Sequence, residues 1–91
     1  MAKQSVHVVV TGRVQGVGFR FFAQDVANSL RLTGWVRNMP NGGVEAEAEG
    51  EKSTLEAWIK ELRQGPPIAR VDHVQLDWRP LSGKFKDFSI R

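Results

Sequence analysis

A glycine-rich segment at residues 12–18 separates a strand-like pattern from a helix-like pattern near the start of the chain. In residues 5–11 valine occupies every second position, and such alternation is typical of a β-strand that buries one face. In residues 19–32 apolar residues recur at helical spacing, which predicts a helix with one stripe facing a core. A strand joined to a helix by a short loop predicts a fold in which helices cover a sheet. The predicted helical stripe consists of Phe22, Val26 and Leu30.

The middle of the chain predicts a β-hairpin. Gly34 marks the exit from the first helix, and residues 35–37 begin a second strand. The pair Asn41-Gly42 is a strong signal for a turn between two strands. Residues 44–49 then alternate valine or alanine with glutamate, which predicts a strand whose glutamates face water.

The second half of the chain predicts one more helix and two more strands. Ser53, followed three residues later by Glu56, fits a capping box at a helix N-terminus. An apolar stripe follows at helical spacing, and the Gly-Pro-Pro of residues 65–67 ends that helix. Alternating apolar residues then predict a strand over 74–78 and a short closing strand over 88–90. The stripe of this second helix is Leu55, Trp58, Ile59 and Leu62.

The resulting element order, β-α-β-β-α-β, predicts an α+β fold of the ferredoxin-like type, an antiparallel sheet with two helices on one face. The chain has 91 residues, of which 41% are hydrophobic and 25% charged. We therefore expect a single globular domain over residues 1–91. Since this fold hosts many unrelated functions, the function has to be argued from the site.

The composition excludes several kinds of chemistry. The chain contains no cysteine, which excludes disulfides, thiolate metal sites, iron–sulfur clusters and a cysteine nucleophile. No apolar run is long enough to span a bilayer, and no apolar signal segment precedes the first strand, so we expect a cytoplasmic protein without a membrane partner. The net charge of +3 could attract an anionic substrate but is also common in proteins that bind none.

The segment from Gly12 to Arg20 has the composition of an anion-binding loop. Its glycines allow positive φ angles, so successive N–H groups can point inward, and the following helix adds the free amides of its first turn. Arg20 could place a planar guanidinium over the same point. The spacing matches neither the dinucleotide fingerprint nor the P-loop, so these residues alone leave a purely structural turn open. Arg13 and Arg37 are interpreted as solvated charges at strand ends.

Two segments of the chain resemble the motifs of the acylphosphatase family. Residues 10–20, V-T-G-R-V-Q-G-V-G-F-R, resemble the first motif, and residues 34–38, G-W-V-R-N, resemble the second. Gly42, Val44 and Gly50 continue the second motif. The chain length, the element order and the C-terminal residues fit the remainder of the family.

The resemblance implies that the chain hydrolyses the carboxyl–phosphate bond of acyl phosphates by attack of water on phosphorus, without a metal or an organic cofactor. Arg20, at the end of the first motif, would bind the phosphate, and Asn38, in the second motif, would position the water. Spacing alone would also fit Asn38 as an ordinary turn residue. Met39 replaces a hydroxyl residue of many animal members, which leaves its effect on Asn38 open. The backbone amides that would hold the phosphoryl oxygens belong to Gln15, Gly16, Val17, Gly18, Phe19 and Arg20.

The other reactive side chains are interpreted as structural. His7 and His73 lie in strand patterns without partners at metal-ligand spacing, so we expect exposed histidines and no metal site. Glu45, Glu47 and Glu49 are expected to form a solvated strand face that discourages association of sheet edges. The tryptophans are expected in the core or at its edge; they are Trp35, Trp58 and Trp78.

Three other functions fit the same element order. An RNA-recognition domain should carry aromatic and basic residues on its third strand. Here residues 44–49 are acidic and the chain has no tyrosine, so we expect no nucleic-acid partner. A regulatory module could bind an anion in the same loop without turnover.

The third alternative is a domain of a carbamoyl-transfer maturation protein, although the initial methionine favours an independent enzyme. We expect a monomer that acts on a small acyl phosphate. The sequence does not distinguish 1,3-bisphosphoglycerate, carbamoyl phosphate and acetyl phosphate as substrates.

Overall fold

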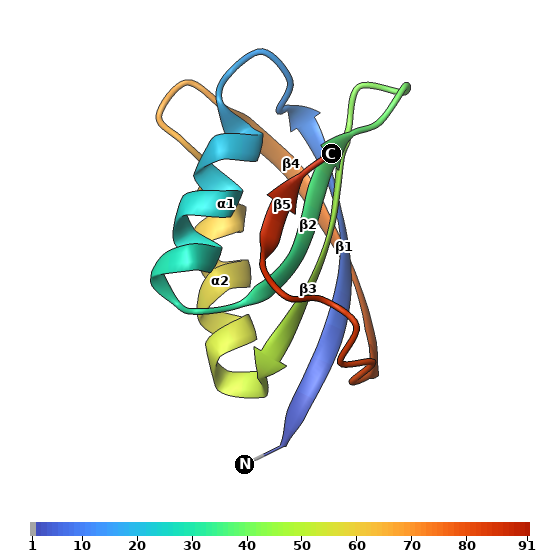
Figure 1. Ribbon diagram of the computed structural model, residues 1–91. Helices are drawn as coiled ribbons and strands as arrows, with labels where there is room; N and C mark the ends of the chain where they lie inside the picture. The colour runs from blue at the N-terminus through green and yellow to red at the C-terminus, as the bar shows by residue number, and fades with distance from the viewer. Residues whose placement is uncertain (1) are drawn as a thin grey trace.

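The computed structural model describes residues 2–91, which form a five-stranded sheet covered on one face by two helices (Figure 1). The strand order is β4-β1-β3-β2-β5, and all neighbouring strands are antiparallel except β2 and β5, which run parallel. The predicted ferredoxin-like α+β fold is confirmed, but the closing strand makes the sheet mixed. Within the described residues, no helix is long and apolar enough to cross a membrane. The elements are β1 (Lys3–Arg13), α1 (Phe19–Ser29), β2 (Thr33–Asn38), β3 (Val44–Glu51), α2 (Lys52–Gln64), β4 (Arg70–Pro80) and β5 (Phe88–Ile90).

The hydrophobic core lies between the sheet and the two helices. The alternating valines of β1, Val6, Val8 and Val10, are at most 1% exposed, which confirms the predicted strand pattern. α1 packs over β2 and β5, and α2 packs over β3 and β4. Trp58 of α2 is fully buried, and its indole N–H donates a 3.1 Å hydrogen bond to the carbonyl oxygen of Ala23 in α1. This bond satisfies the polar edge of the largest core side chain and joins the two helices.

Helix α1 is shorter than predicted. It ends at Ser29 rather than at Leu32, because the chain turns at Arg31, which has a positive φ of 59° although it is not glycine. The residues of the predicted apolar stripe pack against the core but are only partly buried. Small side chains at the centre of the contact let the helix lie close to the sheet. The fully buried row of α1 is Phe19, Ala23 and Ala27.

Strand β2 begins at Thr33, so Gly34 is a strand residue and not the exit from α1. A Cβ atom at Gly34 would lie 1.8 Å from the carbonyl oxygen of Glu47 in the neighbouring strand β3. The glycine therefore permits a close approach between two strand backbones, which the sequence pattern does not reveal.

The predicted capping box of α2 is wrong. α2 begins at Lys52, directly after β3, and its N-cap residue is Glu51, which makes no side-chain capping bond. The backbone N–H of Lys52 donates instead to the carbonyl oxygen of Ala2, at 3.2 Å. Since strand and helix follow each other without a loop, Ser53 already lies inside the first turn of the helix.

The sheet face away from the helices is not the solvated surface that the glutamate alternation predicts. Glu47 and Glu49 are only 9% and 4% exposed. The connection between β4 and β5 folds back across this face (Figure 1), and its residues Ser82 and Gly83 bind Glu49. Ser5 of β1 donates a further hydrogen bond to Glu47, at 3.1 Å. Glu49 thus binds the C-terminal segment to the sheet, while Glu47 binds the neighbouring strand β1.

A second polar cluster on the same face contains His7, whose predicted exposure is also wrong. Its Nε2 lies 2.6 Å from Oε2 of Glu45, and the two side chains are 19% and 17% exposed. Trp35 packs edge-on against the His7 ring, and the Arg91 guanidinium lies 4.8 Å from the centre of the Trp35 ring. The hydrogen bond from His7, aided by Arg37 and opposed by burial, holds the pKa of Glu45 below its ordinary value.

The hydrogen bonds to Glu49 generate a prediction about acid stability. Burial alone would raise the pKa of Glu49, but the donors of Ser82 and Gly83 outweigh it and hold that pKa below its ordinary value of 4.5. The folded state therefore favours the ionised carboxylate, and this stabilisation is present above pH 4.5 and lost as the pH falls through the lower folded-state pKa. We expect Glu49→Gln to lower the free energy of unfolding at pH 7 by about 2 kcal/mol.

Urea unfolding of the wild type and Glu49→Gln, from pH 7 to pH 3, would measure this difference. The two proteins should converge in stability at the acid end. Glu56→Gln, an exposed position on α2, serves as the control and should match the wild type throughout. A stability difference between wild type and Glu49→Gln that did not change with pH would contradict the assigned role of the ionised carboxylate.

Candidate active site

Two glycines in left-handed conformation curl the chain between β1 and α1. Gly16 has a φ of 72° and Gly18 a φ of 77°, as the sequence predicts. A Cβ atom at either position would meet nothing within 4 Å, so glycine is needed here for the backbone conformation and not for space. Val14 and Val17 are 1% and 7% exposed and anchor the loop in the core. The buried valines and the left-handed glycines together therefore hold the loop in a defined shape.

The curled loop presents backbone donors that no protein group uses. Among residues 2–91, no acceptor receives a hydrogen bond from the amides of residues 15–18. Gly18 is the N-cap of α1 and supplies no side-chain cap, and the first turn contains no acidic residue. Free amides in a curled loop and at a helix N-terminus together attract an anion. Loops with such free amides form anion-binding nests in other proteins.

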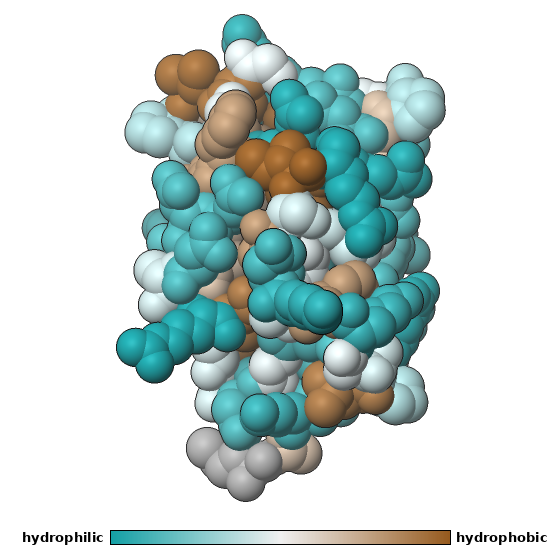
Figure 2. Space-filling view, in the orientation of Figure 1, coloured by the Kyte–Doolittle hydropathy of each residue, from teal (hydrophilic) through white to brown (hydrophobic). Residues whose placement is uncertain are grey.

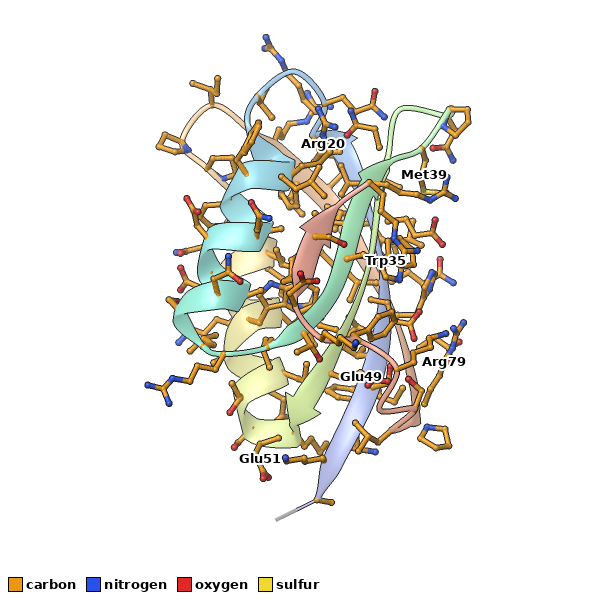
Figure 3. All side chains as sticks on the ribbon, in the orientation of Figure 1. Arg20, Trp35, Met39, Glu49, Glu51 and Arg79 are labelled. Atoms are coloured by element: carbon orange, nitrogen blue, oxygen red, sulfur yellow. The ribbon has the colours of Figure 1, made fainter. Side chains whose placement is uncertain are left out.

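Arg20 lies in the first turn of α1 beside this loop (Figure 3). Its side chain is half-buried and forms no ion pair with a carboxylate in the described part of the chain. Three other arginines, by contrast, are each paired with a carboxylate. A guanidinium without a carboxylate partner, next to free amides, adds a full positive charge to the nest. The paired arginines are Arg37, Arg70 and Arg79.

Asn38 ends strand β2 at the same end of the sheet. It pairs with Val44, which pairs in turn with Val10 near the end of β1, so its side chain shares the helix-covered face with those valines. Its Oδ1 atom is buried and has no hydrogen-bond partner within residues 2–91. A buried acceptor without a donor costs about 1–3 kcal/mol, and such an atom needs an explanation. The structure thus brings an unused acceptor to the end of the molecule that carries the unused donors.

The side chain of Gln15 connects the loop to the turn between β2 and β3. Its Nε2 donates to the carbonyl oxygen of Met39 at 2.7 Å and to that of Gly43 at 2.9 Å. The sequence motif singles out Gln15 only for its backbone amide. The side-chain contacts join residues 24 and 28 positions apart, so no local pattern could have indicated them.

The turn after Asn38 is closed by main-chain hydrogen bonds. The N–H of Met39 donates to Gly43 at 2.8 Å, and the N–H of Gly42 donates to Met39 at 3.2 Å. Asn41 Oδ1 accepts from the N–H of Gly43 at 3.0 Å. Met39, at the end of β2 in Figure 3, contributes only backbone groups to these bonds. The turn therefore does not depend on a hydroxyl side chain at this position.

The remaining charged groups near this end have other roles. Arg37 is 45% exposed but pairs with Glu45 at 2.6 Å, so the predicted solvated charge is an ion pair. Arg13 is exposed, as predicted. His73 is exposed as predicted, on β4 opposite Thr11. Within the described residues, no group of three or more histidines, cysteines and acidic residues could hold a metal ion.

The chain is similar to known proteins over nearly its whole length. A family model described as Acylphosphatase matches residues 6–90. A protein of Anaeromyxobacter sp. (strain Fw109-5) named acylphosphatase is 49% identical over 85 residues, which are 93% of this chain and 91% of that protein. The chain belongs to the acylphosphatase family. It is therefore an enzyme that hydrolyses acyl phosphates.

Solved structures of acylphosphatases share the whole fold. The crystal structure of acylphosphatase from Bacillus subtilis superposes with a TM-score of 0.94 at 35% identity, covering 97% of this chain and 98% of that one. Full-length HypF, in its phosphate- and nucleotide-bound form, matches 99% of this chain with a TM-score of 0.87 at 32% identity, over 12% of its own length. An acylphosphatase-like fold thus also occurs as a small part of a longer protein.

The two glycines of the loop lead to a prediction with a matched control. Gly16→Ala forces an alanine into the left-handed region and should lower the free energy of unfolding by about 1 kcal/mol. Gly83→Ala imposes the same strain at a φ of 70°, also with nothing within 4 Å of the new Cβ, but in the connection between β4 and β5. We expect both variants to lose similar stability and only Gly16→Ala to lose affinity for inorganic phosphate. Thermal unfolding and phosphate titration by calorimetry would measure the two effects, and equal phosphate affinity in both variants would contradict the role of the loop.

Proposed function

We propose that the loop amides of residues 15–20 and the Arg20 guanidinium bind the phosphoryl group, while Asn38 Oδ1 orients the attacking water. The observation that carries this proposal is the buried Oδ1 of Asn38, which has no partner within residues 2–91. It lies at the end of the sheet that also holds loop amides and a guanidinium without acceptors in the same residues. Donors suit the phosphoryl oxygens, and an acceptor suits a water O–H. The donors would therefore bind the acyl phosphate, and the acceptor would bind the water.

The bound phosphoryl group would be stabilised most strongly in the transition state. Phosphoryl transfer passes through a loose transition state with negative charge on the equatorial oxygens. Amides held by a fixed backbone and a guanidinium anchored on a helix need no rearrangement as that charge develops. Val14 and Val17, buried on the inner side of the loop, keep the donors in place. The proposed binding site is thus organised before the substrate arrives.

Asn38 would act on the water and not on the phosphate. Its Oδ1 would accept a hydrogen bond from the O–H of the water and so align a lone pair of the water with phosphorus. A carboxamide is not a base at pH 7, so we propose that the proton passes to a phosphoryl oxygen. The water oxygen forms a bond to phosphorus while the bond from phosphorus to the acyl oxygen breaks. An acyl phosphate dianion and water then give a carboxylate and dihydrogen phosphate, which balances atoms and charge.

The leaving group explains why this site needs no general acid. The departing carboxylate has a conjugate acid with a pKa of about 4, so it leaves as an anion without a proton. A phosphate monoester would instead expel an alkoxide, which generally requires an acid or a metal ion. The proposed groups supply neither, so we expect weak or no activity on ordinary sugar phosphates and phosphoserine. The same argument lets the reaction proceed without a metal or an organic cofactor.

The two proposed roles predict different kinetic defects. Arg20→Ala should lower kcat by about 10²–10³ and also raise the inhibition constant for inorganic phosphate, because it removes a donor to the phosphoryl group. Asn38→Ala should lower kcat by a similar factor of about 10² while the phosphate inhibition constant changes less than about threefold. Benzoyl phosphate hydrolysis in the presence of EDTA, with phosphate as a competitive inhibitor, would measure both constants.

Matched controls separate these roles from general effects of charge and polarity. Arg79→Ala removes one positive charge far from Arg20 in Figure 3, and Asn28→Ala truncates an exposed asparagine of α1. Both should retain the wild-type constants. If phosphate affinity fell equally in Arg20→Ala and Asn38→Ala, the separate roles would be wrong.

We also propose that the enzyme works as a cytoplasmic monomer on small acyl phosphates, without nucleic-acid or membrane partners. On the face in Figure 2 the hydrophobic areas are small and separated by hydrophilic surface. The large apolar side chains that are exposed come from separate parts of the chain, one from α1 and two from connections. Light scattering of the purified chain should therefore give the mass of one chain, and a concentration-dependent dimer would contradict this. These exposed side chains are Phe21, Ile68 and Leu81.

A further inference from the structure

The carboxamide of Gln15 uses both of its N–H groups to cross from the loop to the β2–β3 turn. The distances are 2.7 Å to the Met39 carbonyl oxygen and 2.9 Å to the Gly43 carbonyl oxygen, and the contacts are partly buried. Within residues 2–91, these are the hydrogen bonds that join residues 14–18 to residues 39–43. The side chain therefore forms a two-point hydrogen-bonded link between these two segments.

The link reaches the backbone immediately after Asn38. Met39 follows Asn38 directly, and its carbonyl oxygen is one of the two acceptors. The other acceptor, the Gly43 carbonyl oxygen, also receives the N–H of Met39 at 2.8 Å and so belongs to the bond that closes the turn. A shift of Gln15 relative to this turn would carry the end of β2, and with it Asn38, away from the loop.

We propose that Gln15 is a positioning residue, whose side chain fixes the separation between the phosphate-binding loop and Asn38. This inference rests on the proposed roles of the loop and of Asn38. The loop determines where phosphorus lies, and Asn38 determines where the water lies. An in-line attack needs both positions at once, and a misplacement of about 1 Å can reduce the rate by about a hundredfold.

The link is not what shapes the phosphate site itself. The left-handed conformations of Gly16 and Gly18 and the burial of Val14 and Val17 hold the curl of the loop without it. Arg20 is carried by α1, whose first turn begins beyond the loop. Loss of the Gln15 side-chain bonds should therefore affect the alignment of water with phosphorus more than the binding of phosphate.

The test is a double-mutant cycle with Gln15→Met, Asn38→Ala and the double variant. Methionine has a similar length to glutamine but no donor, so it removes both bonds. We expect Gln15→Met to lower kcat for benzoyl phosphate by about tenfold to a hundredfold, with the phosphate inhibition constant changed less than about threefold. In the Asn38→Ala background the same substitution should lower kcat less than about threefold, because no aligned water remains to be displaced.

Gln24→Met is the matched control. Gln24 also donates its side-chain amide to a backbone carbonyl, that of Phe88 at 3.0 Å, but it links α1 to β5. Its loss should cost similar stability and leave kcat unchanged. Thermal unfolding of all variants shows whether they are folded, and Gln15→Ala, which adds no bulk, replaces Gln15→Met if that variant does not fold.

Different outcomes would overturn different claims. Fully multiplicative losses in the double variant would show that Gln15 acts independently of Asn38 and would refute the positioning role. An equal loss of kcat in Gln24→Met would reduce the effect to general destabilisation, and a matching loss of phosphate affinity in Gln15→Met would place Gln15 in phosphate binding. If Asn38→Ala alone kept its kcat, the proposed function of Asn38 itself would be wrong.

Discussion

Unpaired backbone amides in the loop between β1 and α1 are the feature on which the proposed site depends. Backbone donors without acceptors are unfavourable unless water or a ligand satisfies them, so the loop must be held in this conformation by other parts of the molecule. Burial of Val14, Val17 and Phe19 provides that support, and positive φ angles at Gly16 and Gly18 permit the curl. Packing in the core thus maintains a loop conformation whose amides remain available to an anion.

The sheet then determines what lies beside the loop. β1 and β2 run in the same direction on either side of β3, so the loop after β1 and Asn38 at the end of β2 meet at one end of the sheet. α1 starts at that end and carries Arg20 in its first turn. Arg20 and Asn38, which are 18 positions apart along the chain, therefore lie at the same end of the sheet.

The opposite face of the sheet binds the connection to the closing strand. Glu49 binds Ser82 and Gly83, and these bonds hold the connection that leads to β5. β5 pairs with β2, the strand that ends at Asn38. A carboxylate on the face away from the helices thus holds the segment that leads to the strand beside β2.

The sequence by itself determined the order of the elements, the position of the glycine-rich loop between β1 and α1, and the family. Alternating valines, helical stripes and the Asn-Gly turn are local signals, because each depends on residues within a few positions of one another. The motifs at residues 10–20 and 34–38 carried the resemblance to acylphosphatases, and the family comparison confirms it. The roles of Arg20 and Asn38 stay predictions that their unpartnered groups support.

Only the tertiary structure decided which polar groups are paired and which are free. Gln15 bonds to the β2–β3 turn, His7 pairs with Glu45, and Glu49 is buried under the connection to β5. Each contact joins residues more than 20 positions apart. A periodic pattern reports which face of an element a side chain occupies, but it carries no information about what the folded chain places opposite that face.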